Sequence, residues 1–218
     1  MQLFDAPSEA DLNRDNILEK IGVLRLKKLD LIIREAVQSF IDDYGDQMFW
    51  LSSRTIASHI HDNMHKCCKK LLSIEDKMRL VTQNNTFKLI LDDVNLVLQF
   101  KKFNKKKLTS NIPTNACLAF VRQSPTLFPS FVKLTVGYRL NKSSLSGNFL
   151  EETMIACHNN EYANHWSTKI SDAVNSLIKQ TDSTVPSQVP TRTYKISPKK
   201  IYLLFHKQNN LSFSVYTV

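Results

Sequence analysis

The sequence predicts an α+β fold in which an N-terminal helical layer packs on a mostly antiparallel β-sheet. Two patterns lead to this prediction. Apolar residues recur at three- and four-residue steps through the first third of the chain, which is typical of amphipathic helices. Between residues 86 and 157, β-branched and aromatic residues cluster in short runs, and the run at 131–140 alternates with period two, which indicates strands.

The helical region is expected at residues 1–80 and the mixed sheet region at residues 81–218, forming one integrated domain with a linker near 181–193. Ser8-Glu9-Ala10-Asp11 matches a capping box ahead of the first helix, which Gly22 ends or bends. A second helix is predicted from Val23 to Tyr44 and a third from about Ser53 to Leu72. Amphipathic helices in series must bury their apolar stripes on each other or on the sheet.

The strand predictions centre on residues 131–140. There Val132, Leu134, Val136 and Tyr138 share one face, and Lys133, Thr135, Gly137 and Arg139 share the other. Further runs predict strands or helices. Strands are expected at 86–91, 94–100 and 149–157, a short helix at 114–123, and a helix from about Asn164 to Gln180, with a strand at 166–170 as the alternative.

The C-terminal runs at 200–206 and 211–218 predict a β-hairpin. A hairpin by itself is only marginally stable in water. We therefore expect it to add to the main sheet, to a partner, or to a second copy of the chain in a homo-oligomer.

Composition excludes several classes of protein. The chain has only four glycines, so the glycine-rich loops that bind dinucleotides or ATP phosphates are missing. Four cysteines, two of them adjacent and none in a CxxC pair, predict reduced thiols and a cytoplasmic location. No apolar run approaches the roughly 20 residues of a membrane span. The N-terminus lacks the pattern of a signal peptide, so no membrane association is expected.

Positive charge is the strongest functional signal. The formal net charge is +9, and the basic residues concentrate in the tract 101–107 and in the acid-free segment after residue 183. Such a charge is the footprint of a phosphate binder, so nucleic acid is the first predicted partner. An acidic partner protein is the second, and simple solubility is the remaining explanation. The candidate binding residues are Lys101, Lys102, Lys105, Lys106, Lys107, Arg122, Arg139, Arg192, Lys199 and Lys200.

One predicted helix carries a candidate metal site. His61, His65 and Cys68 follow one another at successive turns, which is ligand spacing for zinc. The His-x3-His spacing resembles the zincin helix. Asp62 stands where that family has its glutamate, which argues against a hydrolytic role. A polar outer face on an ordinary helix explains the same residues.

A second candidate site lies within the hairpin at 86–101, whose acidic turn is formed by residues 92–95. Its acidic turn and the later Gln99-x-Lys101 resemble PD-(D/E)xK nucleases. The resemblance implies that Asp92 or Asp93 is the first Mg²⁺ ligand, that Gln99 is a weaker second ligand, and that Lys101 polarises water or phosphate. The chain departs from that family: the Asp-to-Gln spacing is short, glutamine replaces a charged ligand, and no proline precedes the aspartate. A hairpin with a polar turn needs none of this chemistry.

Short motifs occur in order between residues 87 and 170. They are Phe100-Lys101-Lys102, Asn111-Ile112-Pro113-Thr114, Phe120-x-Arg122-Gln123, Val136-Gly137-Tyr138-x-Leu140 and Trp166. This order resembles uncharacterised bacterial proteins of toxin–antitoxin and prophage loci, of the RosmerTA type. The resemblance covers less than half of the chain. It implies a toxin-like or phage-defence protein that an antitoxin neutralises, often one with a helix-turn-helix domain, and it assigns no catalytic residues.

Some residues near these motifs have two interpretations. Phe103 and Tyr138 could stack on bases, but packing in the core is the favoured interpretation. Glu151 and Glu152 could act as acid and base, but exposed charge is favoured. Neighbours on a strand point to opposite faces, so at most one of the two glutamates could face a site.

Overall fold

The computed structural model describes residues 7–72, 78–83, 86–109, 114–125, 128, 130–141 and 149–183. The chain divides into two compact units, Met1–Asp182 and Ser183–Val218. The predicted C-terminal hairpin, most of the predicted linker, and the candidate residues Arg192, Lys199 and Lys200 lie outside the described residues.

The N-terminal helices form as predicted. Helix α1 spans Arg14–Tyr44 and is interrupted at Gly22, whose φ of 78° and ψ of 157° lie in a region that is nearly restricted to glycine. The Ser8–Asp11 capping box closes a turn before the helix, and Asn13 is the N-cap that accepts the first helical N–H groups. Helix α2 spans Ser53–Leu72, the predicted range.

The sheet contains six strands in sequence order among the described residues. They are β1 (Met78–Gln83), β2 (Thr86–Leu91), β3 (Leu96–Lys102), β4 (Val132–Leu140), β5 (Leu150–His158) and β6 (Asn164–Lys169). Strands β3 and β4 pair in parallel, whereas the other neighbours pair antiparallel. The predicted α+β class and mostly antiparallel sheet are therefore confirmed. Strand β1 was not predicted.

One helix prediction needs correction. Residues 164–169 form strand β6 against β5, and helix α4 begins only at residue 170 (Ile170–Ser183). The alternative, a strand around Trp166, was closer to the structure. The Trp166 indole Nε1–H donates to the Leu12 carbonyl oxygen at 2.8 Å, which ties this edge strand to the segment before α1.

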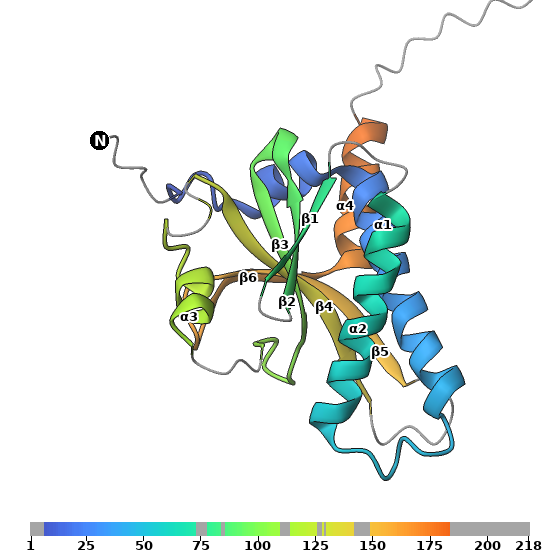
Figure 1. Ribbon diagram of the computed structural model, residues 1–218. Helices are drawn as coiled ribbons and strands as arrows, with labels where there is room; N and C mark the ends of the chain where they lie inside the picture. The colour runs from blue at the N-terminus through green and yellow to red at the C-terminus, as the bar shows by residue number, and fades with distance from the viewer. Residues whose placement is uncertain are drawn as a thin grey trace, which may run out of the picture. The chain divides into compact units, whose positions relative to one another are not determined.

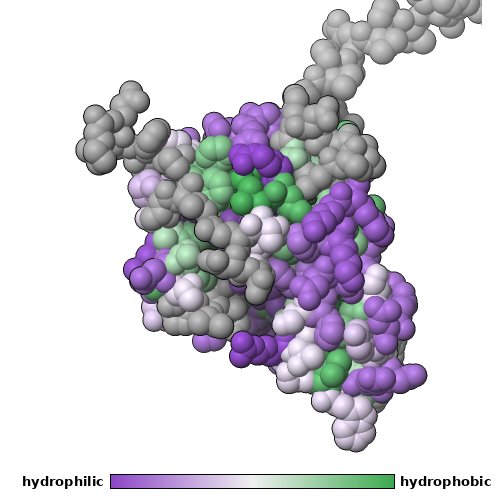
Figure 2. Space-filling view, viewed as in Figure 1, coloured by the Kyte–Doolittle hydropathy of each residue, from purple (hydrophilic) through white to green (hydrophobic). Residues whose placement is uncertain are grey.

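Helices α1, α2 and α4 cover one face of the sheet (Figure 1). The alternate residues of β4 that were predicted to share a face, from Val132 to Tyr138, join this main core. Tyr138 is 1% exposed, which confirms its predicted place in the core. The outward surfaces of α1 and α2 are mostly hydrophilic, as amphipathic helices require (Figure 2).

The opposite face of the sheet is also buried, and we call it the α3 face. Helix α3 (Asn115–Val121), which lies in the connection between the parallel strands β3 and β4, stands on this side (Figure 1). Phe120 packs there with Ile90 and Val97, while Phe103 packs with Met154 and Ala156. Phe103 is therefore a core residue, as predicted.

No helix within the described ranges combines the length and the apolar character that crossing a membrane requires.

The parallel pairing depends on a glycine in β4. A Cβ atom at Gly137 would overlap the carbonyl oxygen of Lys101 on β3. We predict that Gly137→Ala lowers the free energy of unfolding by about 1–3 kcal/mol or more, the usual cost of overpacking a core. Urea unfolding measures this, with the exposed Asn175→Ala on α4 as the control. Equal stability of the two variants would contradict the prediction.

Candidate functional site

The α3 face is built largely from a segment without acidic residues. Residues 94–150 contain no aspartate or glutamate and nine basic residues: Lys101, Lys102, Lys105, Lys106, Lys107, Arg122, Lys133, Arg139 and Lys142. This segment supplies β3, α3 and β4. Neutralisation of its positive charge must therefore come from carboxylates elsewhere in the chain.

Three neighbouring strands each place one lysine on the α3 face, and we call Lys88, Lys101 and Lys133 the lysine cluster. Lys88 alternates with the core-facing Phe87 and Leu89 on β2, Lys101 follows Phe100 on β3, and Lys133 precedes Leu134 on β4. Within the described part of the chain, none of the three forms an ion pair with a carboxylate.

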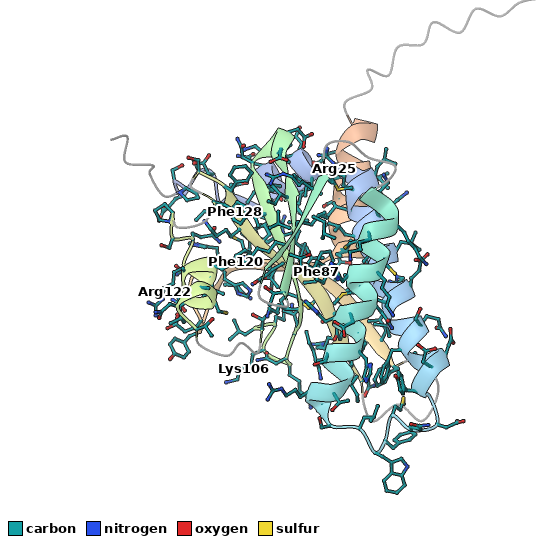
Figure 3. All side chains as sticks on the ribbon, viewed as in Figure 1. Arg25, Phe87, Lys106, Phe120, Arg122 and Phe128 are labelled. Carbon is teal, nitrogen blue, oxygen red and sulfur yellow. The ribbon has the colours of Figure 1, made fainter. Side chains whose placement is uncertain are left out.

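The cluster is desolvated to different depths. Lys133 is 2% exposed, and its Nζ donates to the carbonyl oxygens of Phe128 and Phe131 at 3.4 and 3.3 Å. Lys88 is half-buried, with its Nζ 5.4 Å from the ring centroid of Phe120 and 5.6 Å from that of Phe128. The two phenylalanines are labelled in Figure 3. Burial lowers the pKa of both lysines.

The strand register brings the cluster residues together: Lys88 pairs with Gln99, two residues before Lys101 on β3, and Lys133 pairs with Val97 of β3. The positive charge of Lys101 lowers the pKa of Lys88 further, although Cys117 acts in the opposite direction, and the charge of Lys88 lowers the pKa of Lys133. Burial raises the pKa of the adjacent Cys117 thiol, although Lys101 and Lys88 act in the opposite direction. The lysine cluster therefore places positive charge on a part of the α3 face that is partly shielded from water.

A buried polar network supports this face. The Thr135 hydroxyl accepts a hydrogen bond from Gln99 Nε2 at 2.9 Å and lies 3.0 Å from His158 Nε2. The Gln123 side chain accepts from the Lys133 N–H at 2.9 Å and donates to the Lys133 carbonyl at 2.8 Å. The Gln123 side chain thus makes the two backbone hydrogen bonds that a neighbouring strand would make with Lys133. These bonds hold the segment after α3 on β4.

An ordered loop, residues 104–108, follows β3, and we call it the basic loop. Asn104 Oδ1 accepts from the N–H groups of Lys106 and Leu108 at 2.8 and 3.1 Å. Asn164 Nδ2 on β6 donates to the Lys107 carbonyl at 2.9 Å. The side chains of Lys105, Lys106 and Lys107 are exposed, and Lys106 is labelled in Figure 3. Predicted binding residues 105–107 are therefore accessible and held on a fixed backbone.

The predicted arginines are not available in the same way. Arg122 forms a two-pronged ion pair with Glu161, with N···O distances of 2.6 and 3.1 Å. Arg139 pairs with Glu151 at 2.7 Å and with Glu152 at 3.0 Å. Both arginines thus already pair with carboxylates of the same chain, and their place in the binding set stays a prediction.

Two further expectations change. Lys102 follows Lys101 along β3, so strand alternation assigns it to the opposite face of the sheet. Glu152 was expected to be exposed, but it is 8% exposed and also pairs with Lys169 at 3.3 Å. Glu151 is exposed, as expected.

The residues of the predicted nuclease site lie apart. Asp93 pairs with Arg25 of α1 at 2.7 Å, and Asp92 pairs with Arg79 of β1 at 3.0 Å. The Gln99 side chain donates a hydrogen bond to the Thr135 hydroxyl on the α3 face. The acidic turn ends at Asn95, and Lys101 lies six residues later, roughly 20 Å along an extended strand. The predicted arrangement of Asp93, Gln99 and Lys101 around one Mg²⁺ is not formed.

The predicted zinc ligands are not assembled either. The rings of His61 and His65 both contact the Phe87 ring, with centroid distances of 4.7 and 4.9 Å. Cys68 is 1% exposed, and burial raises its pKa to about 12. Within the described ranges, no three His, Cys, Asp or Glu side chains form a group that could hold a metal ion. The helical spacing instead serves the packing of α2 on the sheet.

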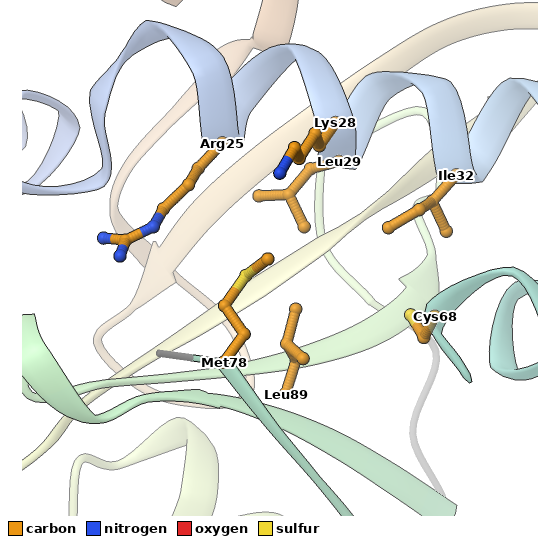
Figure 4. A pocket seen from close by; sticks show the side chains of 7 residues that line it. All are labelled: Arg25, Lys28, Leu29, Ile32, Cys68, Met78 and Leu89. Atoms are coloured by element: carbon orange, nitrogen blue, oxygen red, sulfur yellow. The ribbon is translucent and has the colours of Figure 1, made fainter. Parts of the chain in front are cut away.

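Cys68 faces a small apolar pocket between α1 and the sheet (Figure 4). The pocket contains about 260 Å³ of empty space, including open solvent. It is lined by Arg25, Lys28, Leu29, Ile32, Cys68, Met78 and Leu89. Because the thiol stays protonated and Arg25 already pairs with Asp93, this pocket offers little chemistry.

Comparison of the chain with protein-family models, curated proteins and solved structures gave no match. The case for a function therefore depends on the geometry of the α3 face. Lys88 and Lys133 were missed as functional candidates from the sequence. The signal that could have found Lys133 is the absence of acidic residues from 94 to 150.

Three histidines connect stability to pH. Burial lowers the pKa of His61, His65 and His158 below the ordinary value of 6.5. The unfolded chain therefore binds more protons than the folded chain below about pH 6.5, and we predict that stability falls as the pH drops from 7.5 to 5. Urea midpoints across this range measure the slope.

A matched pair of variants separates the buried histidine from an exposed one. His158→Gln should flatten the slope of stability against pH, while the exposed His165→Gln should leave it unchanged. A slope that His158→Gln does not change would contradict this assignment.

Proposed function

We propose that the protein binds nucleic acid through the α3 face, with the exposed lysines of the basic loop contacting phosphates. The observation that supports this proposal is the unneutralised charge on that face. Lys105, Lys106 and Lys107 are exposed on an ordered loop that follows β3, and the lysine cluster has no carboxylate partners among the described residues. The two arginines of this region are instead occupied by glutamates.

The form of the site matches a phosphate binder better than a catalyst. Lysine contacts to phosphates position a protein on nucleic acid and carry no sequence information. Partly desolvated lysines act through a low-dielectric surface, which extends their positive potential and raises the rate of encounter with a polyanion. The proposed binding is therefore electrostatic, weakly selective for sequence, and strongly dependent on salt.

An acidic protein is the alternative partner for the same face. The resemblance to toxin–antitoxin proteins implies a cognate antitoxin as this partner, and such a protein would compete with nucleic acid. Base stacking is not part of the proposal, since Phe103 and Tyr138 are each 1% exposed.

The binding prediction concerns Lys106 of the basic loop. Lys106→Ala should weaken binding to DNA or RNA about equally for different sequences and reduce the slope of log K against log salt by roughly 1, because one phosphate contact is lost. Fluorescence anisotropy with labelled oligonucleotides over a salt series measures both quantities.

Lys20→Ala is the matched control, since Lys20 is an exposed lysine on α1, which covers the other face of the sheet. It should leave affinity and slope nearly unchanged. No binding of DNA or RNA at low salt would overturn the proposal, as would equal losses in the two variants.

A further inference from the structure

Lys88 differs from the other buried amine of the cluster. Lys133 Nζ is already bonded to two carbonyl oxygens, which gives it a structural role. Lys88 Nζ forms no hydrogen bond or ion pair with the described residues, and its described contacts are the two phenylalanine rings. Its side chain is half-buried and so remains partly open to solvent.

An amine in such a place is easier to deprotonate. An apolar surrounding and a neighbouring cation both disfavour the ammonium form, and this combination activates lysines that form Schiff bases with carbonyl compounds. The rings of Phe120 and Phe128 provide the apolar surrounding, and Lys101 is the neighbouring cation. Cys117 does not compete as a nucleophile, because burial raises the pKa of its thiol.

We propose that Lys88 is a nucleophilic amine that condenses with an aldehyde on a phosphate-bearing molecule. The lone pair of Nζ attacks the aldehyde carbon, a C–N bond forms, and the carbonyl oxygen becomes a hydroxyl group. That oxygen then leaves as water with the two hydrogens that the neutral amine carried, and an imine remains. No oxidant or reductant is consumed.

The neighbouring positive charge selects the phosphate. Lys101 lies close enough to change the pKa of Lys88, and the basic loop begins after the same strand, β3. Two sources share the required chemistry: a small phosphorylated aldehyde, and the sugar aldehyde at an abasic position of DNA. The second source depends on the proposed nucleic-acid binding, whereas the first does not.

The first experiment uses pyridoxal 5′-phosphate, a phosphorylated aldehyde, with the full chain. Borohydride reduction fixes any imine, and peptide mass spectrometry locates it. We expect the adduct at Lys88 at lower reagent concentration than at the exposed Lys105, Lys106 and Lys107, and a severalfold lower yield with pyridoxal, which lacks the phosphate. Lys88→Arg keeps the charge and should lose this adduct, while Lys20→Arg should retain it.

The second experiment uses an oligonucleotide with one abasic position, again with borohydride. Wild-type protein should form a covalent cross-link, Lys88→Arg should lose it, and Lys20→Arg should retain it. A Lys88 adduct with pyridoxal 5′-phosphate but no cross-link would support the small-molecule source.

Some results would overturn the inference. They are adducts spread over the exposed lysines with none at Lys88, or an unchanged adduct yield in Lys88→Arg with a native circular dichroism spectrum. Failure to bind the intact oligonucleotide, with the Lys88 adduct present, would count against the proposed function alone.

Discussion

The parallel pairing of β3 with β4 is the constraint on which the rest of the structure depends. Parallel neighbours cannot be joined by a tight turn, so the chain between them must cross over a face of the sheet. Here that connection contains the basic loop and α3, and it covers the face that α1 and α2 leave open. The close approach of Gly137 to the Lys101 carbonyl shows how tightly the two strands are joined.

The crossover also explains why charged groups are buried. Once α3 and the following segment lie on the sheet, alternate residues of β4 that would otherwise meet water are enclosed. Lys133 is accommodated because two carbonyl oxygens accept its ammonium hydrogens, and Glu152 because Arg139 and Lys169 surround it. Buried charges are costly unless they are paired or hydrogen-bonded. Among the described residues, Lys88 has only the aromatic rings of Phe120 and Phe128 for this purpose, and these compensate less of its desolvation.

The histidines and cysteines illustrate the same contrast between spacing and surroundings. His61 and His65 have the spacing of metal ligands, yet both rings rest on Phe87 at the contact between α2 and the sheet. Cys68 and Cys157 are buried thiols with pKa values raised to about 12, which makes them part of the core and not of a reactive site. Helical spacing alone cannot distinguish a ligand set from a packing stripe, since both need residues on one side of the helix.

Periodicity in the sequence determined the elements: α2 with its bounds, the interruption at Gly22, the hairpin of β2 and β3, and the core face of β4. These are local properties, because each depends on side chains a few residues apart and on the conformational freedom of one glycine. The tertiary structure decided which charges remain available. The sequence gives no sign that Glu161 reaches Arg122, that Glu152 is enclosed beside Arg139, or that Lys88 meets Lys101 and Lys133 on one face. Such contacts join residues far apart in the chain, and only strand order and the path of the crossover bring them together.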